Sequence, residues 1–306
     1  MSRDYISASV VIFGQYGCEA GSVAVQYAIE AYAQRWYPVI SKRRSRRQFD
    51  HTQPIDPDLL ERFRRFCEEF RPFPDARAVL VSKSSDTVFR GAIGPLGKVR
   101  DAPAFVAFIG NTRSPRVQEA VGYTGEGVVL EATASQLGTC WVGGFFRPEV
   151  AARLAETQEN ESVLAVTPIG YVCKNESLEE KLMTGFGRTH KRHPLSHLTT
   201  GLSERDWPEW VRVSLEAARL APSAVNRQPW GFHVEQDSVT VFVRTIEPGF
   251  QVSKRLDCGI AMLHIELGAL SCGLRGEWDL LEQPKVARMT ITGTVKKPQA
   301  SLVASS

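Results

Sequence analysis

The expected secondary structure follows the same order twice along the 306 residues of the chain. In each half, a helix is followed by two strands, a second helix, a segment with glycine and tryptophan, and a further strand. The first set lies at residues 56–70, 78–81, 104–109, 124–137 and 163–172, and the second at residues 206–220, 231–234, 239–244, 258–271 and 288–294. This order indicates an internal duplication, although an ordinary α/β chain can also produce it by chance.

The composition is that of an ordinary globular protein. Hydrophobic residues make up 43% of the chain, charged residues 23%, and the net charge is +3. This balance excludes a disordered or fibrous chain, and the net charge alone identifies no partner. The length allows two domains or one large α/β domain.

Cysteine usage and the N-terminal segment bear on the location of the protein. The six cysteines form no CxxC pair and no disulfide-like spacing, which is typical of a reducing compartment. The longest early apolar run, Ile6 to Gly14, is far shorter than the roughly 20 residues that span a bilayer. We therefore expect a cytoplasmic protein without a signal peptide or membrane segment. Residues 1–38 contain no motif, and we expect an N-terminal extension of unknown role there.

A dense basic run begins at Lys42, where five of six consecutive residues up to Arg47 are lysine or arginine. Arginine recognises phosphate or carbonyl oxygens through its forked guanidinium, so together with Ser45 the run suits an anionic, planar ligand. A solvated basic face, a nuclear-localisation-like string or a nucleic-acid-binding patch explains the same residues. Taken alone, the run favours these simpler explanations.

The segment from Ala221 to Trp230 follows an amphipathic helix and precedes a strand. Pro222 must end the helix, and a second proline stiffens the connection. Ser223, Asn226 and Gln228 offer polar side chains in a turn that could face the polar edge of a ligand. A plain helix-to-strand loop is the alternative.

Two shorter segments also suit a flat, charged ligand. Gly143 and Gly144, after Trp141, allow the backbone to approach a ring closely and leave N–H groups available, although glycine pairs are common in plain loops. A second basic cluster, His190-Lys191-Arg192-His193-Pro194, could neutralise a phosphate.

Other chemistry is excluded by the pattern of the remaining residues. His190, His193 and His197 do not form a convincing metal site, because Pro194 interrupts the helix that their spacing would need and adjacent basic residues repel a cation. The sequence contains no GxSxG, HExxH or Walker A motif, and no GxGxxG after a strand. We therefore expect no metal, and we expect catalytic power to come from a cofactor.

Together these segments resemble the nitroreductase family of FMN-dependent NAD(P)H oxidoreductases, and more closely its fused subgroup, in which one chain mimics the usual homodimer. The resemblance covers residues 37–293. Its most specific part is the match of residues 221–230 to Ala-Pro-Ser-x-x-Asn-x-Gln-Pro-Trp, followed by the run Arg43-Arg44-Ser45-Arg46-Arg47. It implies an α+β, nitroreductase-like fold in which two homologous α/β halves, residues 39–200 and 201–306, have mixed sheets and flanking helices and form an intrachain pseudo-dimer.

The resemblance also implies which residues bind the cofactor. In the family, the Arg-x-Ser-x-Arg element holds the ribityl phosphate and pyrimidine edge of FMN, the Gly-Gly segment faces flavin N5, and a basic residue before a Pro-Leu pair binds phosphate. The Pro-Ser-x-x-Asn element reaches the flavin from the opposite subunit. In this sequence these roles fall to Arg43, Arg44, Ser45, Arg47, Gly143, Gly144, Lys191, Arg192, Pro222, Ser223, Ala224, Asn226 and Gln228. A lysine that is usual two places before the phosphate-binding residue is His190 here.

The distribution of these elements predicts a single site. The arginine and glycine elements occur in the first half and the Pro-Ser-x-x-Asn element in the second, while residues 71–78 lack that signature. One chain would therefore supply both sides of one site. We expect one FMN per chain and a protein that can work as a monomer.

The expected activity is ping-pong hydride transfer from NAD(P)H through flavin N5 to a quinone, a nitroaromatic or a similar small acceptor. No catalytic acid, base or nucleophile from the protein is expected, and Arg43 or Arg47 would stabilise negative charge on the reduced ring. Two alternatives stay open: a flavin-binding carrier or sensor without turnover, and a nucleic-acid-binding module that uses residues 42–47.

Overall fold

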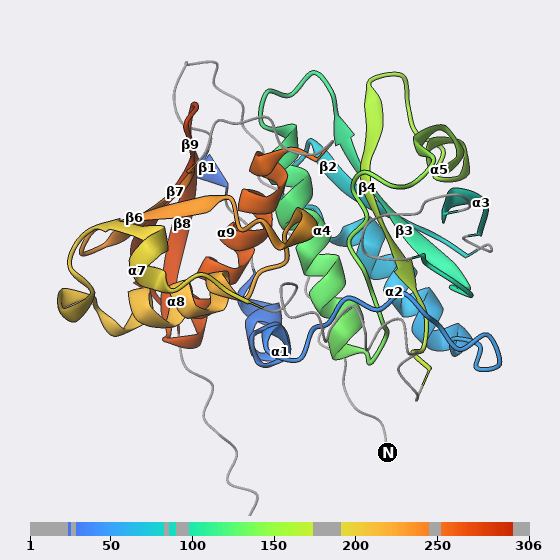
Figure 1. Cartoon of the computed structure of the whole chain (residues 1–306), viewed down its shortest axis with the longest axis horizontal. Coiled ribbons are helices and arrows are strands. Elements are labelled where there is room, and N and C mark those ends of the chain that lie inside the picture. The colour runs from blue at the N-terminus through green and yellow to red at the C-terminus, as the bar shows by residue number, and fades with distance from the viewer. Residues whose placement is uncertain are drawn as a thin grey trace, which may run out of the picture.

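The computed structural model describes residues 24–25, 29–82, 86–89, 98–173, 191–244 and 252–295. Two long helices, α4 (Val117–Ala134) and α9 (Lys254–Ser271), pack side by side at the centre, and a sheet lies on either side of them (Figure 1). Most residues of both helices are buried. The described chain is thus an α+β structure built around one helix pair.

The smaller sheet has three antiparallel strands in the order β2 (Ala76–Val81), β3 (Ala104–Asn111) and β4 (Glu161–Ile169). Beyond β4, Val142 forms an antiparallel bridge with Val166. Residues 139–142 therefore run along the edge of this sheet.

The larger sheet is mixed, because one neighbouring pair of strands is parallel and the others are antiparallel. In spatial order its strands are β1 (Ala24–Val25), β8 (Leu274–Leu280), β9 (Lys285–Thr294), β7 (Ser238–Val243), β6 (Trp230–Val234) and β5 (Thr199–Gly201). The mixed sheets and flanking helices predicted for the fold are confirmed.

Shorter helices surround the central pair. They are α1 (Glu30–Ile40), α2 (Pro57–Glu69), α3 (Asp86–Phe89), α5 (Pro148–Leu154), α7 (Leu195–Leu198) and α8 (Glu209–Arg219), with 3-10 turns at Glu204–Asp206 and Ala224–Asn226. The start of α2 is the one predicted from the sequence, because the Asp56 side chain accepts a hydrogen bond of 2.8 Å from the Leu59 amide.

The closest approach of α4 and α9 depends on two glycines. A Cβ atom placed on Gly122 would lie 2.0 Å from the Leu256 carbonyl oxygen, and one on Gly259 would lie 2.1 Å from the Glu119 carbonyl oxygen. Each glycine is the sixth residue of its helix, and each faces the third residue of the other. The contact is therefore reciprocal.

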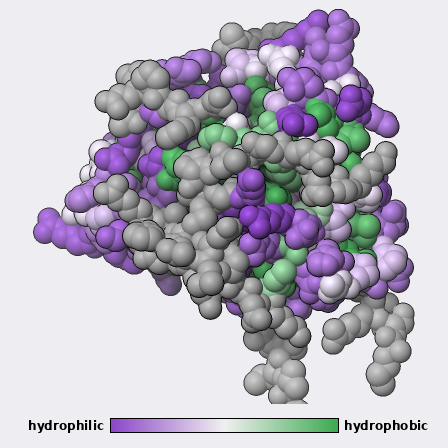
Figure 2. All heavy atoms as spheres, turned by 45° about the vertical axis from the view of Figure 1, so that its right-hand side comes forward, coloured by the Kyte–Doolittle hydropathy of each residue, from purple (hydrophilic) through white to green (hydrophobic). Residues whose placement is uncertain are grey.

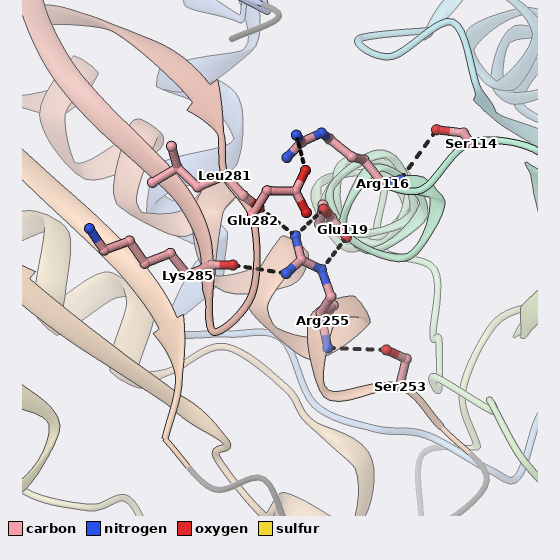
Figure 3. A network of polar contacts seen from close by, with 8 residues as sticks. All are labelled: Ser114, Arg116, Glu119, Ser253, Arg255, Leu281, Glu282 and Lys285. Atoms are coloured by element: carbon pink, nitrogen blue, oxygen red, sulfur yellow. Dashed lines mark hydrogen bonds and ion pairs between the residues drawn. The ribbon is translucent and has the colours of Figure 1, made fainter. Parts of the chain in front are cut away.

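An ion pair fixes the beginnings of the two central helices to the hairpin between β8 and β9 (Figure 3). The Arg255 guanidinium donates to the buried Glu119 carboxylate, with an Nε–Oε2 distance of 3.0 Å. It also donates to the carbonyls of Leu281 at 3.1 Å and Lys285 at 2.8 Å. The beginnings of α4 and α9 and the turn between β8 and β9 are thereby held together.

Some elements differ from the sequence prediction. The helix expected at residues 124–137 spans residues 117–134, and the helix expected at 258–271 begins at Lys254. Burial on nearly all sides removes the polar stripe that would have marked these ends. Strand β8 was not predicted, nor was α1, whose Trp36 is fully buried in the main core. Residues 30–38, predicted as part of an extension, therefore belong to a helix that packs into the core through Ala33 and Trp36.

The surface carries few large apolar side chains. Among the described residues, Phe145 is the one large hydrophobic residue that is exposed, at 42%. On the face in Figure 2, hydrophilic residues cover most of the described surface and smaller hydrophobic areas lie between them. In the described part of the chain, no helix combines the length and apolar character required to cross a bilayer.

Candidate functional site

The arginine segment, residues 43–47, lies beside the glycine segment, residues 139–144. Ser45 forms a parallel bridge with Thr139, and the Arg46 amide donates to the Thr139 carbonyl at 2.7 Å. The Arg47 carbonyl accepts a hydrogen bond of 2.9 Å from the Arg100 amide. Two segments that the sequence analysis treated separately therefore run next to each other.

Arg43 is the buried member of the arginine segment, with 7% of its surface exposed. Its Nε atom is buried and has no hydrogen-bond partner within the described residues. Burial lowers the pKa of its guanidinium, and the nearby Glu126 carboxyl acts in the opposite direction. Arg44 and Ser45 are exposed, and Arg44 Nη1 donates to the carbonyls of Ser41 and Arg43, both at 2.8 Å.

The Pro-Ser loop, residues 220–229, has an uncommon backbone. Val225, Asn226 and Gln228 have positive φ angles of 48°, 57° and 46°. Such angles cost free energy in residues other than glycine, especially in a β-branched residue, and they occur often at functional sites. The loop must therefore be held in this shape by its surroundings.

Part of that support comes from the start of α9. The Asp257 carboxylate accepts hydrogen bonds from the Ala224 amide at 3.1 Å and from Arg227 Nε at 2.7 Å. Within the loop, the Ser223 hydroxyl accepts a hydrogen bond of 2.9 Å from the Gln228 amide. Burial raises the pKa of Asp257 to about 6, although Arg227 opposes the shift.

The rest of the support comes from the tail, residues 191–193. The Lys191 carbonyl accepts hydrogen bonds from Asn226 Nδ2 at 2.9 Å and Gln228 Nε2 at 3.1 Å. The Gln228 side-chain oxygen accepts a bond of 2.8 Å from the His193 amide. The side chains of Asn226 and Gln228, predicted to contact a cofactor, thus bind the tail and position its basic residues.

Arg192 is the central side chain of this contact. It donates to the Asn226 side-chain oxygen and, through Nη2, to the Leu220 carbonyl at 3.2 Å. Its pKa is lowered to about 10, first by burial and then by the positive charges of Arg43, Arg219 and Arg44. The positive charges of the arginine segment and of the end of α8 therefore act on Arg192, although Arg219 is itself paired with the Glu216 carboxylate at 2.6 Å.

Gly143 and Gly144 are half-buried at the end of the glycine segment. A Cβ atom on Gly143 would lie 2.8 Å from Val252 Cγ2. The Val252 carbonyl in turn accepts a hydrogen bond of 2.9 Å from Arg227 Nη2. The glycine segment therefore approaches the residues that hold the Pro-Ser loop.

The structure thus gathers the arginine segment, the glycine segment, the tail and the Pro-Ser loop in one region. Lys191 is exposed, Pro222 is buried, and Ser223 and Ala224 are half-buried. His190 lies outside the described residues. Asp257 and Arg219 were not predicted from the sequence, although a serine cap at Ser253 followed by an acidic residue in the first helical turn is a recognisable signal for Asp257.

Comparisons with known proteins identify the family and the fold. Residues 35–269 match the protein-family model described as "Putative TM nitroreductase". The chain is also similar to a solved structure described as a putative nitroreductase from Thermotoga maritima, with 17% identity, coverage of 83% of this chain and 93% of that chain, and a TM-score of 0.56. At this level of identity the likeness concerns the fold.

Two further structures have lower TM-scores. A nitroreductase with bound FMN from Bacteroides fragilis is 17% identical over 46% of this chain and 90% of that chain, with a TM-score of 0.37. An FMN-dependent nitroreductase from Clostridium difficile is 15% identical over 45% of this chain and 88% of that chain, with a TM-score of 0.38. No curated protein sequence matches the chain.

Proposed function

This chain belongs to the nitroreductase family described as "Putative TM nitroreductase", and from that membership and the site geometry we propose that it is an FMN-dependent NAD(P)H oxidoreductase. The observation that carries the proposal is that Arg192 feels the positive charges of Arg43 and Arg44, which lower its pKa in addition to burial. Grouped guanidiniums repel one another, so the arrangement favours a bound anion with several oxygen atoms.

The residues present fit FMN in three respects. The buried Arg43 Nε atom has no hydrogen-bond partner within the described residues, which suits a ligand acceptor such as a pyrimidine oxygen. The side chains of Lys191 and Arg192 can neutralise a phosphate. Gly143 and Gly144 leave main-chain amides free of Cβ interference, as close approach to a flat ring requires.

FMN would supply the hydride-accepting and hydride-donating atom. The residues of the protein would bind and orient FMN. Arg192 and Lys191 would hold its phosphate, and Arg44, Ser45 and Arg47 would line its ribityl and pyrimidine side. Arg43 would stabilise negative charge from a buried position, where electrostatic interactions are stronger than in water. Pro222, Ser223 and Ala224 would form the opposite side. NAD(P)H and a small acceptor would use the same site in turn, which predicts ping-pong kinetics.

We further propose that residues 39–200 and 201–306 are two related halves that together hold one FMN. The strand order β2, β3, β4 followed by residues 139–142 parallels the order β6, β7, β9, β8. The reciprocal contact of Gly122 and Gly259 supports the same relation between α4 and α9. Because the arginine and glycine segments belong to one half and the Pro-Ser loop to the other, a monomer would contain a complete site.

The test is to purify the full chain, record its visible spectrum and count flavin per chain. One FMN per chain, with oxidation of NADH or NADPH in the presence of a quinone or nitroaromatic, is the expected result. Two FMN per chain would contradict the single site. A fully loaded protein without turnover would instead be a flavin carrier or sensor. A colourless protein whose nucleic-acid affinity falls steeply with salt would contradict the flavin proposal.

A further inference from the structure

Glu126 in α4 and His264 in α9 form a polar pair in the interior of the protein, where both side chains are 0% exposed. His264 Nε2 lies 2.9 Å from Glu126 Oε1, and His264 Nδ1 lies 2.8 Å from the Ala217 carbonyl oxygen. The second carboxyl oxygen of Glu126 accepts a hydrogen bond of 2.8 Å from Trp141 Nε1. Every polar atom of the pair therefore has a partner.

These contacts join elements on both sides of the candidate site. Trp141 lies two residues before Gly143, and its indole fits against α4 because a Cβ atom on Gly125 would lie 2.4 Å from the ring. Ala217 lies in the last turns of α8, directly before the Pro-Ser loop. The pair thus connects the glycine segment to the helix that leads into the Pro-Ser loop.

The contacts of the imidazole also determine how many protons the pair must hold. A carbonyl oxygen only accepts, so His264 Nδ1 must carry a hydrogen. His264 Nε2 then faces a carboxyl oxygen, and a second hydrogen must lie between these two atoms to avoid the contact of two lone pairs. This hydrogen sits on the imidazole or on the carboxyl group, and in both cases the net charge of the pair is zero.

We propose that Glu126 and His264 are positioning residues that share one proton in a neutral buried pair and thereby fix the glycine segment relative to the Pro-Ser loop. The second part of this inference rests on the proposed function, since these segments are the proposed sides of the FMN site.

The proton is tested in the full-length protein without added FMN, by nitrogen NMR of ring-labelled histidine. The expected spectrum has a protonated His264 Nδ1 in the wild-type protein. In Glu126→Gln, the side-chain amide can donate a hydrogen bond to His264 Nε2, and its oxygen can accept one from Trp141. His264 Nδ1 therefore stays protonated, and His264 Nε2 carries no hydrogen. An unprotonated Nδ1 in the wild-type protein would overturn the shared proton.

Positioning is tested by comparing Glu126→Gln with Glu126→Ala. The main-chain amide resonances of Gly143 and Gly144 should stay in place in Glu126→Gln and shift in Glu126→Ala. FMN affinity, measured by quenching of flavin fluorescence, should remain within about 3-fold of wild type in the first variant and fall by about 10-fold or more in the second, the equivalent of about 1.4 kcal/mol.

Glu131 provides a matched control on the same helix. Its carboxylate accepts a hydrogen bond of 2.8 Å from the indole of Trp36, which belongs to α1 and not to the candidate site. Glu131→Ala should lower the melting temperature while leaving the Gly143 and Gly144 resonances and the FMN affinity unchanged. If Glu126→Ala behaves in the same way as Glu131→Ala, the pair is only structural and the positioning inference is wrong.

Failure of the proposed function gives a different result. A wild-type protein that binds no FMN would contradict the flavin proposal, while the histidine spectrum and the glycine resonances would still decide the proton and the positioning. If the Gly143 and Gly144 resonances shift as far in Glu126→Gln as in Glu126→Ala, the inference of a neutral pair is wrong, even if FMN binds.

Discussion

Two loops make the same kind of connection, from a helix to the first strand of an antiparallel pair. The α2–β2 loop spans residues 70–75 and the Pro-Ser loop spans residues 220–229. The shorter loop buries Phe70 and Phe73 in the core and contains no positive φ angle. The longer loop contains three such angles in residues other than glycine.

The difference lies in how each loop is held. Buried aromatic side chains anchor the α2–β2 loop, and apolar burial of this kind is non-directional. The Pro-Ser loop is held by hydrogen bonds that it donates to the Asp257 carboxylate and the Lys191 carbonyl and by one that it accepts from Arg192, and these bonds offset a strained backbone. The strained backbone and buried polar groups of this loop cost stability. In return, the hydrogen bonds hold Arg192 and Arg227 in defined positions, as a binding site requires.

Unlike the two loops, the central helices α4 and α9 contact each other in the same way from both sides. The largest predicted loss of stability tests this reciprocal contact. Gly122→Ala and Gly259→Ala should each lower the free energy of unfolding by about 3 kcal/mol, because the new methyl group meets a main-chain carbonyl oxygen that cannot move without separating the helices. Denaturant unfolding of both variants measures the effect.

Gly293→Ala in β9 is the control, since a Cβ atom at that position meets nothing within 4 Å. We expect it to change stability by no more than about 0.5 kcal/mol. A large cost at Gly122 with none at Gly259 would show that the contact is not reciprocal in energy and would weaken the relation proposed between the halves.

Sequence reasoning found the segments of the site because their residues are unusual at a local level. A proline such as Pro222 after an amphipathic run indicates the end of a helix, and a run of arginines at residues 43–47 needs an explanation in any fold. The cap at Asp56 was likewise predictable, since it depends on residues three positions apart.

The features that could not be predicted from the sequence depend on contacts between residues that are distant in the chain. Glu126 and His264 lie in helices that are apolar on most sides, and nothing near either residue indicates its partner 138 positions away. The contacts of Asn226 and Gln228 with the tail could not be predicted either, because Lys191 lies 35 and 37 positions away from them. The ends of α4 were misplaced for a related reason, because a helix buried on all sides has no amphipathic pattern.

Removal of the arginine that links the tail to the Pro-Ser loop is the next prediction. Arg192→Ala should weaken FMN binding about 100-fold, or about 3 kcal/mol, because it removes charge-assisted bonds to the phosphate and releases Asn226. Titration of the flavin-free protein with FMN measures the loss.

The α2–β2 loop supplies the matched control, since Arg71 lies in it and donates to the Glu68 carbonyl at 3.1 Å. Arg71→Ala should leave FMN affinity unchanged. An equal loss in both variants would mean that general positive charge, rather than this site, attracts the ligand.

The buried carboxyl that holds the Pro-Ser loop predicts a pH dependence. The pKa of Asp257 is raised to about 6 from 3.8, so the folded protein takes up this proton at a higher pH than the unfolded chain does. The contribution of this group to stability is therefore present at low pH and is lost as the pH rises through that window. Protonation also weakens the bonds to Ala224 and Arg227, and FMN affinity should fall about 10-fold between pH 7 and pH 5.

Asp257→Asn isolates this effect, because the phosphate of FMN also titrates near pH 6. The variant should bind FMN more weakly than wild type at pH 7 and converge with it at pH 5. A constant ratio of the two affinities across this range would contradict the assignment of the pH dependence to Asp257.

The smallest predicted effect concerns the strained backbone itself. Val225→Gly loses side-chain contacts and gains unfolded-state entropy, but it also relieves the cost of a β-branched residue at a φ of 48°. These terms nearly cancel, so the free energy of unfolding should change by less than about 0.5 kcal/mol. Asp75→Gly in the α2–β2 loop relieves no strain and should cost about 1 kcal/mol. If denaturant unfolding gave equal costs for the two variants, the Pro-Ser loop would store no strain, and its difference from the α2–β2 loop would reduce to length and polarity.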